Sequence, residues 1–275
     1  MPPTEHCAIG LGNWLLFGAS RRGRSHAHAG TYREDAFAIT SSPMGEEPHW
    51  WALAVADGAG SCRLSRVGAG RAVREVTTNL GRPESLKSGP EKRFRGAVLN
   101  TLGALEREAR LRSCDIKDLS CTLLVLFWVE DPECRGGTVF TFQAGDGLIV
   151  STDQQGRFHS LAAQDGESFA GTTHFFTGQH VWDTWDCRFA NIRVLESPFG
   201  FLAMSDGVSD DLVPYDANGP IIVKELSRIL KRQDPGAELV DLLGYEKRGS
   251  FDDRTLVCAF RRDIGAATPT VPLHV

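Results

Sequence analysis

The chain has 275 residues, of which 41% are hydrophobic and 24% are charged, a composition typical of soluble globular proteins. Its formal net charge is −5 and it has no block of basic residues, so composition gives no support to binding of nucleic acid or of an anionic membrane surface. The longest apolar run, 123–129, is far shorter than the roughly 20 residues of a membrane span. The first residues also lack the basic region and long apolar core of a signal peptide.

Seven cysteines are scattered along the chain, and no two stand in C-x-x-C spacing. An odd number of cysteines in a chain long enough to form a core indicates free thiols in a reducing compartment, so we expect a cytoplasmic protein. No group of Cys and His has the spacing of zinc ligands, which argues against a zinc site.

Apolar segments of strand length recur along the chain, and they cover 13–19, 35–40, 50–56, 191–196, 199–204 and 255–260. Four other segments have the apolar spacing or the start signals of a helix: 64–80, the segment from Pro90, 220–230 and the segment from Asp234. From residue 119, short β segments and tight turns predict an antiparallel meander, with a hairpin turn at 153–156.

The order of these elements is strands, a helix pair, many strands, a second helix pair and a last strand. This order predicts antiparallel sheets with helices packed outside, an α+β layered sandwich. No repeat, linker or domain boundary interrupts the sequence. We therefore expect one domain over 1–275, with a core from about 12 to 262 and a flexible tail at 263–275.

Acidic residues stand where several predicted strands begin or end. Asp57, Asp146 and Asp206 each follow an apolar strand and are each followed by Gly. The pairs Glu34-Asp35 and Asp252-Asp253 stand beside the start of a strand. One Asp-Gly is typical of a simple turn. Five such places together predict a cluster of acids from distant parts of the chain.

A cluster of acids needs compensating cations, because burying an unpaired carboxylate costs several kcal/mol. No run of Lys or Arg is placed to supply them, so divalent metal ions are the natural partners. Ligands that are all oxygen favour Mg²⁺ or Mn²⁺ over Zn²⁺. Two such ions about 4 Å apart would hold and acidify a bridging water, the usual nucleophile for attack on phosphorus.

Six short motifs contain these acids, and their order along the chain resembles that of the type 2C metal-dependent Ser/Thr protein phosphatases. The resemblance extends from about residue 12 to 262, and the opening loop is similar to a prokaryotic branch of the family. The motifs are Arg33-Glu34-Asp35, Ala56-Asp57-Gly58-Ala59-Gly60, Ser120-Cys121-Thr122, Ala144-Gly145-Asp146-Gly147, Ser205-Asp206-Gly207-Val208-Ser209-Asp210 and Ser250-Phe251-Asp252-Asp253-Arg254-Thr255.

The resemblance implies a four-layer α-β-β-α sandwich of two antiparallel sheets flanked by helix pairs. It implies a binuclear Mn²⁺ or Mg²⁺ centre, with a third ion in some members. A bridging hydroxide at this centre would hydrolyse phosphoserine or phosphothreonine in proteins, with Asp57, Asp206 and Asp252 as the central catalytic ligands. Residues 166–177 match the family's variable flap, the segment to which the family's substrate preference is assigned.

The resemblance also implies a role for each matching residue. Asp57 would bridge both metals, and Gly58 would ligate one metal through its backbone carbonyl. Asp206 and Asp252 would ligate one metal. Glu34 and Asp35 would order the water shell of the other metal, and Asp146 would ligate the third.

Three positions depart from the family pattern. Many members have an Arg four residues before the Glu to hold the substrate phosphate, and this chain has Gly30 there. Ala59 replaces a His of the eukaryotic branch that is a candidate general acid, which leaves leaving-group protonation to a metal-bound water or to a His elsewhere. Asp253 stands where the family usually has Asn. The candidates for the missing phosphate contact are Arg33, Arg24 and His26, and His26 is also the candidate proton donor.

Other functions are consistent with parts of the sequence. Cys187 and Arg193 have the Cys-x5-Arg spacing of cysteine-dependent phosphatases, but the five residues between them contain no Gly and continue into a predicted strand, which argues against that mechanism. A phosphoprotein-binding pseudophosphatase without turnover and a metal-dependent phosphodiesterase remain the alternatives. We expect a monomer that acts on a phosphoprotein, with no nucleic acid or membrane partner. The family also suggests a Ser/Thr kinase that acts on the same substrates.

Overall fold

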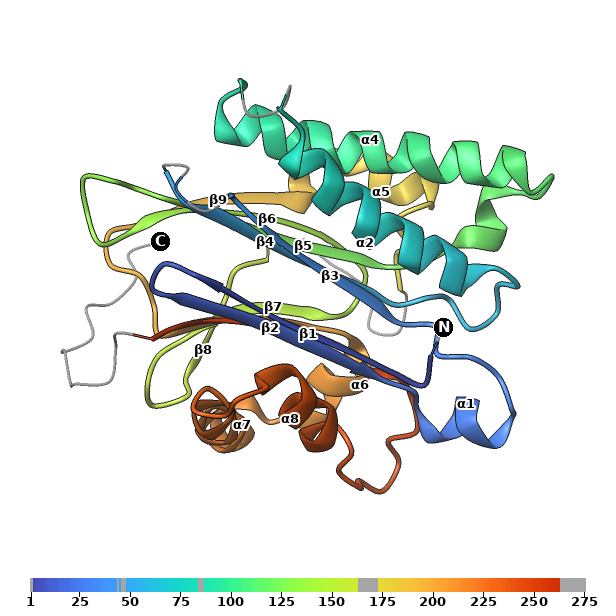
Figure 1. Ribbon diagram of the computed structural model, residues 1–275. Helices are drawn as coiled ribbons and strands as arrows, with labels where there is room; N and C mark the ends of the chain where they lie inside the picture. The colour runs from blue at the N-terminus through green and yellow to red at the C-terminus, as the bar shows by residue number, and fades with distance from the viewer. Residues whose placement is uncertain (1, 44, 46–47, 84–86, 163–172, 263–275) are drawn as a thin grey trace.

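The computed structural model describes residues 2–43, 45, 48–83, 87–162 and 173–262 of the chain. Two antiparallel sheets lie face to face, and helices cover the outer face of each (Figure 1). This arrangement confirms the predicted α-β-β-α sandwich. The predicted tail at 263–275 and most of the predicted flap at 166–177 lie outside the described residues.

The first sheet has six strands in the order β1-β2-β11-β10-β7-β8. Their bounds are β1 Thr4–Leu11, β2 Trp14–Arg21, β7 Leu148–Thr152, β8 Phe158–Ser160, β10 Gly200–Met204 and β11 Arg254–Arg261. The second sheet has five strands in the order β3-β4-β5-β6-β9. Their bounds are β3 Ala36–Ser41, β4 Trp50–Ala56, β5 Leu123–Glu130, β6 Gly137–Ala144 and β9 Phe189–Val194.

Two long helices, α2 (Ser65–Gly81) and α4 (Pro90–Leu111), cover the second sheet, and α7 (Tyr215–Ile229) and α8 (Pro235–Leu242) cover the first. Pro90 and Pro235 each stand in the first turn of their helix, where the missing N–H is tolerated. The shorter helical segments are α1 (Arg24–His28), α5 (Gln179–Asp183), α6 (Asp206–Ser209), η1 (Ile116–Leu119), η2 (Trp185–Arg188) and η3 (Asp210–Leu212).

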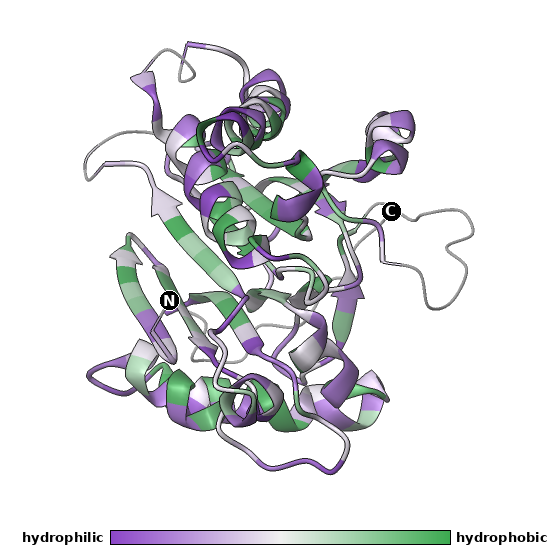
Figure 2. Cartoon of the chain, turned by 90° about the vertical axis from the view of Figure 1, so that its right-hand side faces the viewer, coloured by the Kyte–Doolittle hydropathy of each residue, from purple (hydrophilic) through white to green (hydrophobic). Residues whose placement is uncertain are grey.

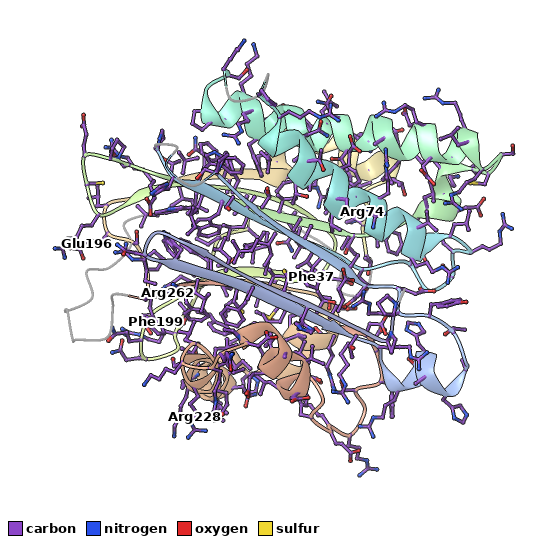
Figure 3. All side chains as sticks on the ribbon, viewed as in Figure 1. Phe37, Arg74, Glu196, Phe199, Arg228 and Arg262 are labelled. Carbon is purple, nitrogen blue, oxygen red and sulfur yellow. The ribbon has the colours of Figure 1, made fainter. Side chains whose placement is uncertain are left out.

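Three apolar layers hold the sandwich together, one between the sheets and one between each sheet and its helices. Figure 2 shows hydrophobic residues along the strands and hydrophilic residues on the outward surfaces of the helices. Between the sheets, Phe37 belongs to the central layer, where side chains fill the space (Figure 3). These layers fix the relative position of the strand ends.

A cluster of aromatic rings joins the sheets where β2, β4 and β10 begin. Trp14 and Phe201 come from the first sheet, and Trp51 and Trp128 come from the second. The ring centroids of Trp14 and Trp51 are 5.1 Å apart, and those of Trp51 and Phe201 are 5.4 Å apart. Aromatic contacts of this kind add to the stabilisation gained from burial, so this end of the sandwich is firmly packed.

Two features of the strand order differ from the sequence-based expectation. β1 was not predicted, and it lies before the expected start of the core; it is an edge strand with mostly exposed side chains, so its apolar signal is weak. The predicted meander is wrong between β6 and β7, because β6 pairs with β9 in the second sheet whereas β7 pairs with β10 in the first. The predicted hairpin at 153–156 is confirmed, since β7 and β8 pair as antiparallel neighbours. The chain changes sheets through Gly145-Asp146-Gly147, where Gly145 has a φ of +117° that favours glycine.

Candidate metal centre

The register of both sheets brings the predicted acids to one edge of the sandwich. In the second sheet, Ala36 pairs with Ala56, so Asp35 and Asp57 extend from neighbouring strand ends. In the first sheet, Met204 at the end of β10 pairs with both Leu256 of β11 and Leu148 of β7. The acids that flank those three strands at this edge are Asp206, Asp252, Asp253 and Asp146.

Close backbone approach explains why two of the motif glycines are needed. A Cβ at Gly207 would lie 2.0 Å from the carbonyl oxygen of Asp253, so the β10 motif and the segment before β11 touch through this glycine. A Cβ at Gly58 would lie 2.9 Å from the carbonyl carbon of Ser65, so the turn after β4 packs against the start of α2. Any larger residue at either position would separate the segments that carry the acids.

Asp35 and Asp57 are the central acids of this edge. Asp35 is 1% exposed, and its Oδ2 accepts hydrogen bonds from Ser205 Oγ at 2.8 Å and Thr255 Oγ1 at 2.6 Å. Burial and the charge of Asp253 raise the pKa of Asp35 to about 7. Burial, followed by the charges of Asp35 and Asp206, raises the pKa of Asp57 well above its usual value.

Asp206 and Glu34 complete the group of perturbed acids. Burial and the charges of Asp146 and Asp252 raise the pKa of Asp206 to about 6. Burial also raises the pKa of Glu34, whose Oε2 is buried and accepts no hydrogen bond within the described residues. Asp210 was not among the predicted ligands, but burial and the charge of Asp146 raise its pKa as well. Carboxyl groups from five segments of the chain therefore repel one another at one edge.

The donor set fits a divalent cation. Within the part of the chain that the structure describes, Asp57, Asp206 and Asp252 form no hydrogen bond or ion pair with a Lys or Arg. Among the described residues their charge has no cationic partner, and Glu34 Oε2 is a buried oxygen that accepts no hydrogen bond there. Hard oxygen ligands with excess negative charge match Mg²⁺ or Mn²⁺.

Asp253 has a different role from its neighbour Asp252. Its Oδ1 accepts hydrogen bonds from Gly23 N at 2.6 Å and His26 Nδ1 at 2.9 Å, and its Oδ2 accepts from Glu34 N at 2.6 Å. Both carboxylate oxygens of Asp253 accept hydrogen bonds, and the side-chain nitrogen of an Asn could not accept them. This explains the Asp at a position where the family usually has Asn, and it fixes the 23–35 loop against the start of β11.

His26 is held in this network. Burial alone would lower its pKa, but the hydrogen bond and charge of Asp253 outweigh burial and raise it. Among the described residues, the group of three or more His, Cys, Asp or Glu whose donor atoms lie within 4.8 Å of one another consists of His26, Asp252 and Asp253. Because Asp253 is saturated with hydrogen bonds, we interpret His26 and Asp253 as a hydrogen-bonded pair rather than as ligands.

A second polar network lies beside the acidic edge and is centred on Asp211. Arg254 Nη2 donates to Asp211 Oδ2 at 3.2 Å, and that oxygen also accepts from Tyr245 Oη at 2.7 Å and Ser250 Oγ at 2.6 Å. Arg254 directly follows the Asp252-Asp253 pair, and Asp211 follows the Asp206 motif. This network was not predicted from the sequence, and it joins the chain after Asp206 to the loop before Asp252.

The predicted phosphate contacts are not equally placed for that role. Arg33 is fully buried and pairs with Glu5, and its Nη1 donates to Ser20 O at 3.0 Å, which does not agree with a contact to substrate. Arg24 is half exposed and lies 3.6 Å from Glu246. His26 donates or accepts at Asp253, as described above.

The family model of protein phosphatase 2C matches residues 22–244, which is most of the chain. The chain belongs to the protein phosphatase 2C family. This family is metal-dependent, in agreement with the acidic donor set described above. A curated relative, serine/threonine-protein phosphatase 3 of Escherichia coli (strain K12), is 29% identical over 171 residues. That match spans 61% of this chain and 64% of the length of the relative.

Solved structures share the fold at low sequence identity. A bacterial serine phosphatase matches 94% of this chain and 97% of its own, with 13% identity and a TM-score of 0.58. A serine/threonine phosphatase of S. agalactiae matches 94% of this chain and 99% of its own, with 14% identity and a TM-score of 0.58. RsbX in complex with magnesium matches over 94% of this chain and over the full length of its own chain, with 14% identity and a TM-score of 0.53.

Within the described residues, no helix combines the length and apolarity required to span a bilayer.

Proposed function

We propose that this member of the phosphatase 2C family hydrolyses phosphoserine or phosphothreonine in proteins at a binuclear Mn²⁺ or Mg²⁺ centre. The observation that carries the proposal is the gathering of uncompensated acids at one edge of the sandwich, with the pKa of Asp35, Asp57 and Asp206 all raised. Such a site is unfavourable in the metal-free protein and favourable for a bound divalent cation.

The residues proposed to hold the metals come from both sheets. Asp57 and the carbonyl of Gly58 lie after β4 of the second sheet, and Asp206 and Asp252 flank β10 and β11 of the first. Glu34 and Asp35 would order the water shell of one ion, and Asp146 is the proposed ligand of a third. When bound, the ions would stabilise the charge that develops on the phosphoryl oxygens and lower the pKa of coordinated water.

The protein itself contributes preorganisation. Ser205 and Thr255 hold the Asp35 carboxylate, and Thr122 Oγ1 accepts a hydrogen bond from Asp57 N at 2.8 Å. Asp253 fixes the backbone at Glu34. These contacts set the positions of the acids before any ion or substrate arrives, so little reorganisation is needed on binding.

Hydrolysis assays test the proposal. The purified protein should release phosphate from a phosphothreonine peptide and from p-nitrophenyl phosphate in the presence of Mn²⁺ or Mg²⁺ but not of EDTA. Asp57→Asn and Asp206→Asn should each reduce turnover by about 100-fold or more, because each removes a charged metal ligand. Asp241→Asn, an exposed position on α8, is the matched control and should keep full activity.

Two outcomes would contradict the proposal. A correctly folded protein that binds Mn²⁺ without turning over either substrate would support the binding-module alternative. Turnover of bis-p-nitrophenyl phosphate in preference to the phosphopeptide would support a phosphodiesterase.

A further inference from the structure

A cation from the protein would add to the proposed metal ions in binding the substrate phosphate, and the two arginines expected to supply it are engaged elsewhere. Gly30 stands at the family's usual Arg position; it has a φ of +68°, and no atom lies within 4 Å of where its Cβ would be. Arg33 is buried against Glu5, and Arg24 is paired with Glu246. Arg22 donates to Thr31 O at 3.0 Å. The three arginines of the 22–33 loop are thus engaged within the protein, and His26 is hydrogen-bonded through Nδ1 to Asp253.

Arg66 is differently placed. It lies in the first turn of α2, and its backbone N is 3.1 Å from the position that a Cβ of Gly58 would take. Its guanidinium carbon lies 4.0 Å from the centroid of the Tyr32 ring. Within the described residues, the side chain of Arg66 makes no hydrogen bond or ion pair, so the five N–H donors of its guanidinium have no protein acceptor there.

Tyr32 brings this side chain to the acidic edge. Tyr32 is 55% exposed and precedes Glu34 by two residues. The carboxylate of Glu34 lies against the turn after Asp57, because its Oε2 is 3.9 Å from where a Cβ of Gly60 would be. The Arg66–Tyr32 stack therefore joins the two segments that carry Glu34 and Asp57, and Figure 1 shows these segments, before β3 and after β4, at the same edge of the sandwich.

We propose that Arg66, held against the ring of Tyr32, binds the phosphate group of the substrate in place of the arginine that is missing at Gly30; this inference rests on the proposed phosphatase function. A guanidinium stacked on an aromatic face keeps its N–H edge free, and that edge matches two phosphate oxygens. The stack also restricts the side chain before substrate binds. Tyr32 is then a positioning residue and Arg66 is a substrate-binding residue.

Steady-state kinetics with a phosphothreonine peptide and p-nitrophenyl phosphate, at saturating Mn²⁺, test the inference. Arg66→Ala should lower kcat/KM for both substrates by about 10- to 100-fold, the loss expected for a charge-assisted hydrogen-bonded contact. Arg66→Lys should recover part of the loss, since Lys supplies a point charge without the fork. Tyr32→Ala should raise KM, and Tyr32→Phe, which keeps the ring, should not.

A direct binding measurement separates this inference from the proposed function. Orthophosphate binding to the Mg²⁺-loaded protein, measured by titration calorimetry, should weaken at least 10-fold in Arg66→Ala. Mn²⁺ affinity, read from the metal-induced shift of the melting temperature, should stay unchanged. Arg63→Ala is the matched control, because Arg63 is an exposed residue of the turn that precedes α2 and should leave both measurements unchanged.

The outcomes are distinct. Wild-type turnover that depends on Mn²⁺, combined with equal orthophosphate affinity in wild type and Arg66→Ala, would overturn the inference and leave the proposed function standing. A wild type without turnover would overturn the proposed function, and the orthophosphate titration would still decide on Arg66. If Arg66→Ala lowers the melting temperature while orthophosphate affinity is unchanged, the stack is a brace between two loops and the inference is wrong.

Discussion

Replacing Asp35 with Asn should stabilise the metal-free protein at pH 8. Asp35 is 1% exposed, and burial together with the charge of Asp253 raises its pKa from 3.8 to about 7. A carboxyl whose pKa is higher in the folded state than in the unfolded state favours folding when it is protonated, so stability falls as the pH rises from about 4 through about 7. At pH 8 this rise in pKa corresponds to a cost on the order of 4 kcal/mol.

An Asn at position 35 removes the charge and keeps an oxygen for the hydroxyl groups of Ser205 and Thr255. We expect a gain of about 2 to 4 kcal/mol at pH 8, and we expect it to shrink by about 3 kcal/mol when the pH is lowered to 5, where Asp35 is already protonated. Urea denaturation in EDTA, followed by circular dichroism at both pH values, measures the gain.

Asp153→Asn is the control with the opposite sign. Burial opposes ionisation of Asp153, but hydrogen bonds from Arg157 and Gln155 outweigh it and lower the pKa. Its carboxylate therefore stabilises the fold above about pH 4, and this stabilisation is lost as the pH falls through the lowered pKa of Asp153. Asp153→Asn should lower the free energy of unfolding at pH 8. An Asp35→Asn protein that is no more stable than wild type at pH 8, or whose gain does not change with pH, would refute the reasoning about uncompensated acids.

Three further changes test the contacts around the site. Asp253→Asn should cost about 1 to 3 kcal/mol in urea denaturation, because an amide nitrogen cannot accept the backbone N–H groups that its carboxylate accepts; unchanged stability would contradict that role. Gly207→Ala should lower the free energy of unfolding by about 2 kcal/mol or more, since its Cβ would lie 2.0 Å from a carbonyl oxygen. Gly96→Ala, with open space around it, should not. Burial opposes ionisation of Asp211, but hydrogen bonds from Ser250 and Tyr245 outweigh it and lower its pKa. Asp211→Asn should therefore destabilise the protein at pH 7, and this effect should fade as the pH falls through the lowered pKa, as followed by acid unfolding.

The fold was largely predictable because most strands are buried on both faces and read as continuous apolar runs. β4 is buried along its whole length, and its predicted range, 50–56, agrees with the structure. β1 was missed because an edge strand with exposed side chains has little apolar signal. The change of sheet after β6 could not be predicted either, since local turn chemistry at Gly145 does not specify which sheet the next strand joins.

The acids of the candidate site were predictable as a set, because each stands at the end of a recognisable strand. Their individual environments were not. Arg33 and Asp253 are charged residues in site motifs, and both are buried in contacts with distant segments, Glu5 and Gly23 among them. Sequence position shows that such a residue is near the site. Only tertiary packing decides whether its charged group faces a ligand or is paired with another group inside the protein.

The two ends of the sandwich are held by different chemistry. At one end, Trp14 and Phe201 of the first sheet pack on Trp51 of the second, a contact that needs no ligand. At the other end, Asp57 belongs to the second sheet and Asp206 to the first, and without a cation they repel. An ion bound between them would link the two sheets reversibly. Metal availability would then set the local stability of the catalytic end and leave that of the aromatic end unchanged, a difference that amide hydrogen exchange of β4 and β10 with and without Mn²⁺ can resolve.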